Sequence, residues 1–148
     1  MAGPCVPVYV PRRPSPAEEL RVRGMIHAIA STVRGDDFWI AQRPFFVRFH
    51  DPDDEVAALV IDGWSPKGVI SYCALCNDAI DHVFLGMLCH RTAQLLEGMI
   101  ALHDVSALTR DSAVLGFDGA RPIKGHGYVV RPEFLGRWMA HPEFRLTK

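Results

Sequence analysis

Four side chains of the kinds that bind zinc lie close together in the sequence: Cys73, Cys76, His82 and Cys89. Their spacing, C-x2-C-x5-H-x6-C, is close to that of a zinc knuckle. The apolar pattern, however, predicts that His82 and Cys89 lie on one helix, two turns and about 10 Å apart along its axis. A single ion with ligand bonds of about 2.0–2.3 Å does not easily reach both. We therefore expect packing thiols, with no metal and no cofactor.

The Cys73-Ala-Leu-Cys76 segment also has the spacing of a redox-active dithiol. We expect Cys73 inside a strand, where residues three apart point to opposite faces, and only Cys76 near a helix start. This geometry disfavours a thioredoxin-like role. Because the first residues of the sequence do not have the pattern of an export signal, we expect its 4 cysteines to be reduced thiols.

Other catalytic patterns are absent from the sequence. The 7 histidines are scattered, and the neighbours His50-Asp51 and Asp81-His82 do not by themselves orient a catalytic pair. No serine has the context of a nucleophile elbow, and the glycines around His126 do not form a phosphate-binding loop. We therefore predict that the protein is not an enzyme.

Composition excludes several classes of protein. The chain has 148 residues, with 16 basic and 17 acidic side chains, 49% hydrophobic residues and a pI of about 6.6. The balanced charge argues against a nucleic-acid binder, and no apolar run approaches the length of a membrane span. The proline-containing start does not fit a signal peptide. We expect a cytoplasmic protein with neither nucleic-acid nor membrane partners.

The charge is nevertheless unevenly distributed, because residues 35–82 hold 3 basic and 9 acidic side chains. Such a run is either a solvated set of loops or a surface that steers and docks a basic partner. Under the second interpretation the acidic side chains supply charge pairing and an exposed tryptophan supplies buried area. The candidate partner-binding residues are Asp36, Asp37, Asp51, Asp53, Asp54, Glu55 and Trp64.

Periodicity predicts the elements that position these residues. Alternation predicts a strand over 5–10, and a Ser15–Glu18 capping box begins a helix over 16–34. Strands follow within 37–49 and over 55–62 and 68–76, the last two joined by a loop over 63–68. A mostly buried helix runs from Asn77 or Asp78 to about Glu97. The C-terminal part has strands over 99–102, near 113–117 and over 128–130, then a helix over 133–140.

This order predicts a single α+β domain over residues 1–148, with a mostly antiparallel sheet and about three helices packed against it. No linker, repeat or low-complexity segment divides the chain.

Four segments resemble a family of proteins from high-GC Gram-positive bacteria that is known mainly as a domain of unknown function. They are RGDDFWI (34–40), GWSPKGVISYCALCNDAIDHVFLG (63–86), LLEGMIAL (95–102) and HPEFRLTK (141–148). Members of this family look like the small α+β immunity proteins encoded in polymorphic-toxin loci. The chain departs from the family pattern at Cys89-His90, which further weakens the zinc hypothesis.

The resemblance implies a non-catalytic binding protein that neutralises one cognate toxin by direct contact, and it transfers no specific contact residues. Together with the acidic zone, it predicts an immunity-type protein whose toxin is basic, such as a nuclease. The alternative is a small metal- or thiol-dependent enzyme or module that uses Cys73, Cys76, His82 and Cys89.

Overall fold

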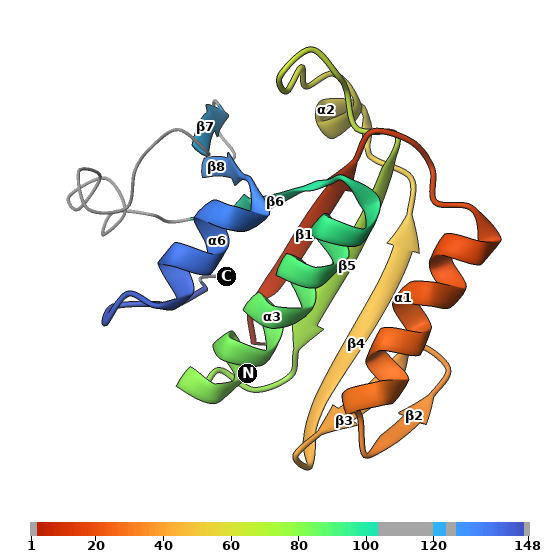
Figure 1. Ribbon diagram of the computed structural model, residues 1–148, viewed down its shortest axis with the longest axis vertical. Helices are drawn as coiled ribbons and strands as arrows, with labels where there is room; N and C mark the ends of the chain where they lie inside the picture. The colour runs from red at the N-terminus through yellow and green to blue at the C-terminus, as the bar shows by residue number, and fades with distance from the viewer. Residues whose placement is uncertain (1–2, 104–119, 124–126, 147–148) are drawn as a thin grey trace.

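The strand nearest the N-terminus lies in the interior of an eight-stranded antiparallel sheet (Figure 1). The computed structural model describes residues 3–103, 120–123 and 127–146, and the strand order over these residues is β2-β3-β4-β5-β1-β6-β8-β7. The strands are β1 (Cys5–Val10), β2 (Thr32–Arg34), β3 (Asp37–Ile40), β4 (Arg43–His50), β5 (Gly68–Ala74), β6 (Met99–Leu102), β7 (Ala120–Ile123) and β8 (Gly127–Val130).

The position of β1 follows from the connection between β5 and β6. Both strands pair antiparallel with β1, so they run parallel to each other on either side of it. Parallel strands need a crossover, and α3 (Ala79–Leu96) supplies it across β1. The result is a split β-α-β unit with the N-terminal strand at its centre.

Helices α1 (Pro16–Ile29), α3 and α6 (Pro132–Met139) pack against one face of the sheet. Figure 1 shows α1 and α3 side by side in front of the strands. Alternate strand residues point into this layer. Four of them are at most 2% exposed: Val6, Val8, Ile70 and Tyr72. This is the larger core of the described chain.

A second, smaller core lies on the opposite face. Tyr9, Val69 and Met99 come from the sheet, and Val56 and Ile61 cover them from the segment after β4. The other half of this face, over β4, β5 and the start of β1, has exposed residues such as Cys5 and Arg48. The two faces of the sheet are therefore covered to different extents in the described chain.

The α+β architecture predicted from the sequence is confirmed, as are the Ser15–Glu18 capping box, the strand β1 and the helices α3 and α6. The helix predicted over 16–34 ends earlier, at Ile29, because Thr32–Arg34 pair with β3 as an additional strand. The strand predicted near 113–117 lies outside the described residues.

The strand predicted over 55–62 is wrong. The segment begins with a single helical turn, α2 (Asp54–Ala57), which Asp53 caps by accepting a hydrogen bond from the Val56 N–H (2.8 Å). Val56, Leu59 and Ile61 pack on the second core, whereas Val60 is 77% exposed. Burial of these three side chains explains most of the apolar pattern without strand pairing. Residues 63–68 are consequently not a hairpin loop between paired strands.

None of the helices in the described part of the chain combines the length and apolarity needed to cross a bilayer.

Candidate functional site

Four of the predicted binding residues, Asp51, Asp53, Asp54 and Glu55, form one exposed segment that follows β4 and continues into the first turn of α2, here called the acidic segment. Its backbone is held by the Asp53 cap on α2 and by the packing of Val56 into the second core. The charge of Asp53, together with burial, raises the pKa of Tyr9 on the underlying sheet, with burial the larger cause. The segment is therefore anchored against the sheet.

Part of this negative charge is already paired within the chain. Both carboxylate oxygens of Asp51 accept hydrogen bonds from the Arg13 guanidinium, whose Nε lies 3.0 Å from Oδ1. The pair is exposed, so water screens it and its contribution to stability is small. Asp54 and Glu55, in the first turn of α2, are the positions at which negative charge is favoured by the helix dipole.

The remaining acidic candidates lie elsewhere. Asp36 receives a hydrogen bond from Arg23 (2.9 Å), and Asp37 is in β3 directly opposite Phe46 of β4. Phe46 precedes Asp51 by five residues, which is about 16 Å along a strand. The structure therefore divides the predicted acidic surface into two groups along β4 and does not bring all six side chains together.

Trp64, the predicted anchor, is half-buried rather than free. Its backbone forms two hydrogen bonds with Ile61 (2.7 and 3.0 Å), and its ring packs against the second core. It also lines a cavity of about 320 Å³ with Asp62 and Arg131, whose side chains form an ion pair (2.8 Å). Packing of the Trp64 ring against the second core thus uses part of the surface that a docking anchor would need.

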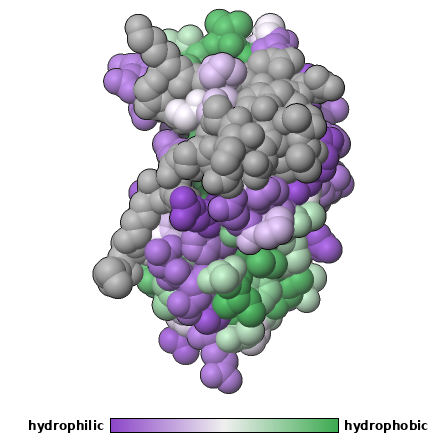
Figure 2. All heavy atoms as spheres, turned by 90° about the vertical axis from the view of Figure 1, so that its left-hand side faces the viewer, coloured by the Kyte–Doolittle hydropathy of each residue, from purple (hydrophilic) through white to green (hydrophobic). Residues whose placement is uncertain are grey.

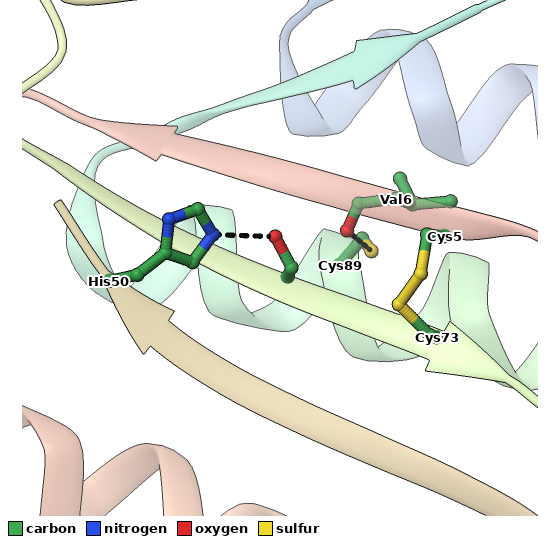
Figure 3. Close-up of a disulfide and its surroundings, with 6 residues drawn as sticks. Cys5, Val6, His50, Cys73 and Cys89 are labelled. Carbon is green, nitrogen blue, oxygen red and sulfur yellow. Dashed lines mark hydrogen bonds between the residues drawn. A yellow bond between two sulfur atoms is a disulfide. The ribbon is translucent and has the colours of Figure 1, made fainter. Parts of the chain in front are cut away.

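The four residues of the predicted zinc or thiol cluster do not converge. Cys73 is joined to Cys5 by a disulfide (Figure 3). Cys76 is exposed beyond the end of β5. Cys89 is buried on the opposite side of the sheet, where its thiol donates to the Val6 carbonyl (3.9 Å). Burial raises the pKa of the Cys89 thiol, which makes it unreactive. Within the described residues no three His, Cys, Asp or Glu side chains form a metal-binding group.

The disulfide shows that the prediction of reduced thiols is wrong for Cys5 and Cys73, whereas Cys76 and Cys89 are free cysteines. Cys5 and Cys73 are direct partners in the β1–β5 register, with Cα atoms 4.1 Å apart. The Ala74 N–H donates to the Pro4 carbonyl (3.0 Å), so the adjoining Cys5–Cys73 pair is a non-hydrogen-bonded one. Side chains of such pairs approach most closely. Cys5 lies 68 residues from Cys73, and no local pattern links them.

A histidine–serine contact, which sequence reasoning did not find, lies on the same face of the sheet (Figure 3). Nδ1 of His50 lies 2.9 Å from the Asp51 carbonyl oxygen, which can only accept, so the neutral ring carries its proton on Nδ1. Nε2 then accepts from the Ser71 hydroxyl (3.0 Å). Because the His50 ring is exposed to water, the contact orients polar groups on the surface without forming an enclosed reaction site.

An exposed apolar group lies where α3 begins. Leu75, Ile80 and Val83 are each between 44% and 47% exposed. Figure 2, which views the molecule from the left side of Figure 1, shows hydrophobic side chains gathered below the grey atoms. Beside this group Arg43 joins β4 to α3 by ion pairs with Asp78 (2.7 Å) and the buried Asp81 (3.1 Å).

The model of a family of unknown function, DUF6368, matches residues 2–148. No curated protein and no solved structure matches the chain.

Proposed function

Since the chain belongs to the DUF6368 family, whose function is unknown, we propose a function from its own surfaces: a non-catalytic, immunity-type protein that neutralises a cognate toxin by direct binding. In this proposal the protein acts in the cytoplasm. The partner is a protein with a basic surface, as expected of a toxin that acts on nucleic acids.

The observation that carries the proposal is the acidic segment. Asp51, Asp53, Asp54 and Glu55 are exposed on a backbone that is fixed by the α2 cap and by Val56 in the second core. A fixed array of like charges accelerates the encounter with an oppositely charged partner, and it loses little conformational freedom on binding. A mobile acidic loop offers the first advantage without the second.

The face of β4 next to the acidic segment offers additional surface that a partner could contact. His50 and Arg48 of β4 point to the same exposed face, and Phe46, two residues further, is half-buried there. Aromatic and arginine side chains are enriched at the centres of protein interfaces. In this role Phe46 replaces Trp64, which packs against the second core.

The test begins with capture of the partner. Tagged protein is mixed with lysate and secreted fractions of its source organism, and a retained protein with a toxin domain is purified. Association and dissociation rates are then measured at several salt concentrations for the wild type and for Asp54→Asn/Glu55→Gln. Glu133→Gln, which removes an exposed negative charge from the first turn of α6, is the control.

We expect Asp54→Asn/Glu55→Gln to slow association about two- to tenfold at low salt and to flatten its salt dependence. Glu133→Gln should leave both unchanged. Equal effects of the two variants would remove the acidic segment from the interface. Failure of the wild type to retain any toxin would contradict the immunity function itself.

A further inference from the structure

We propose that the Cys5–Cys73 disulfide is a thiol-exchange site, at which a low-molecular-weight thiol attacks the exposed Cys5 sulfur and becomes attached there. The inference concerns a covalent modification and does not depend on the proposed binding function. It rests on the exposure of the two cysteines and on the residues at either end of the sulfur–sulfur axis.

The two cysteines differ in access to solvent. Both point to the partly uncovered face of the sheet, since Val6 on one strand and Ala74 on the other belong to the opposite core. Cys5 is exposed, whereas Cys73 is only 3% exposed. A small thiol in solution therefore meets the Cys5 sulfur first.

The direction of attack favours the same sulfur. Thiol–disulfide exchange is a displacement in which the attacking thiolate, the attacked sulfur and the leaving sulfur align. Attack on Cys73 must come from the side of β4, where Phe46 is its direct partner in the β4–β5 register. The half-buried Phe46 ring lies on the face that carries the disulfide, so it obstructs this approach.

Attack on Cys5 comes instead from the side of β6. That strand pairs with β1 only at Val8 and Tyr9, so over the described residues no paired strand lies beside Cys5 on that side. Among the described residues, the sheet thus leaves the Cys5 end of the disulfide open and closes the Cys73 end.

The step is balanced without a further reactant. The thiolate of the small molecule forms a bond to the Cys5 sulfur, and the Cys5–Cys73 bond breaks. The electron pair leaves with the Cys73 sulfur, which takes a proton from water. The small thiol is oxidised to the mixed disulfide on Cys5, and Cys73 is reduced. A second small thiolate then attacks the small-molecule sulfur of the adduct and forms a disulfide between the two small molecules, and the electron pair leaves with the Cys5 sulfur, which takes a proton and becomes a thiol.

Glutathione is the probe, and Cys76→Ser is the background because it removes the exposed free thiol. The protein is oxidised with oxidised glutathione, freed of it, and exposed to reduced glutathione at several concentrations. Samples are quenched in acid at successive times, and free thiols are alkylated. Peptide mass spectrometry then locates the glutathione adduct.

We expect at least tenfold more adduct on Cys5 than on Cys73, formed at a rate proportional to the glutathione concentration. Phe46→Ala should open the other end of the axis and raise the share of adduct on Cys73. Phe49→Ala removes a ring from the opposite face of the same strand and should leave that share unchanged.

Three results would overturn the proposal. One is adduct distributed equally between the two cysteines, and another is an exchange rate independent of glutathione, which would mean that the protein must unfold first. The third is absence of the disulfide after oxidation. Because the readout is the site and rate of modification, none of these results bears on toxin binding.

Discussion

The backbone N–H of Leu146 donates a hydrogen bond to Nδ1 of His82 over 2.6 Å, joining the end of the described chain to the first turns of α3. Acceptance at Nδ1 requires that this nitrogen carry no proton. The other ring nitrogen, Nε2, then donates to Oδ1 of Asn77 (3.1 Å). The neutral tautomer of His82 is thus the form that holds Leu146, whose side chain is buried in the larger core.

This contact predicts a loss of stability in mild acid. Burial, the largest cause, lowers the pKa of His82, and the charge of Arg145 lowers it further, against the opposing effects of Asp81, Asn77 and Asp78. The unfolded chain, with an ordinary histidine pKa of about 6.5, therefore takes up a proton before the folded chain does. The free energy of unfolding should fall as the pH drops below about 6.5, and this fall should end once the pH is below the lowered pKa of His82 in the folded state.

The measurement is urea unfolding of the wild type and of His82→Asn at pH 7.5 and 5.5. The asparagine carbonyl can accept from Leu146 but does not titrate in this range. His82→Asn should therefore lose the His82 share of the pH dependence. An identical pH dependence in both proteins would show that other groups cause the decline.

A second prediction concerns the buried hydrogen bond between the Tyr72 hydroxyl and the Thr92 hydroxyl (2.6 Å). Removing one partner leaves the other without its bond inside the core. We expect Tyr72→Phe and Thr92→Val each to lower the free energy of unfolding by about 1–2 kcal/mol. Chemical denaturation checks the values. The double variant should lose less free energy of unfolding than the sum of the two single losses, because the second substitution leaves no further buried polar group without a partner. Additive losses would argue against the bond.

The third prediction concerns Arg43, which is the cation bound to the buried carboxylate of Asp81. Arg43→Ala removes this partner from the Asp81 carboxylate, whose side chain is only 1% exposed. We expect the free energy of unfolding to fall by about 2 kcal/mol. Adding Asp81→Asn should restore part of the stability, because the buried charge is removed. Arg13→Ala, which breaks an exposed pair, is the control and should change stability by less than about 0.5 kcal/mol. Equal losses for the two arginine variants would contradict this account.

A fourth prediction is that the disulfide stabilises the fold beyond the pairing of β1 with β5. It closes a loop of 68 residues, which in the chain-entropy model corresponds to at most about 4 kcal/mol. Cys5→Ser/Cys73→Ala should unfold at lower denaturant concentration than the oxidised wild type. Wild type kept reduced should behave like this variant. No difference between oxidised and reduced protein would mean that the loop is not closed in solution.

Local features of the sequence predict much of the fold. The Ser15–Glu18 capping box, the glycine after Glu97 and the alternation of Val6, Val8 and Val10 depend only on neighbouring residues, and the corresponding boundaries agree with the structure. The strand prediction over 55–62 failed because an apolar run of this length, here Val56 to Ile61, occurs both in strands and in segments that pack over a core. Burial of Val56 and Ile61 in the second core is compatible with either structure.

The surfaces are less predictable, because they depend on the order of the strands. The separation of Asp37 from Asp51 follows from the β3–β4 register, and the Arg13 and Arg23 contacts follow from the path of the chain around α1. Likewise, Cys5 meets Cys73 only because β1 lies beside β5. The sequence indicates which side chains could interact, and the order of the strands in the sheet determines which of them are in contact.

The central place of β1 also has a consequence for biosynthesis. This strand is translated before both of its neighbours, because β5 and β6 end at residues 74 and 102. At translation rates of about 5–20 residues per second, the 92 residues from Val10 to Leu102 take about 5–20 s. Until residue 74 is made, the nascent chain carries this apolar strand with neither neighbour complete, and until residue 102 it has only β5. The strand is therefore most open to chaperone binding during this interval.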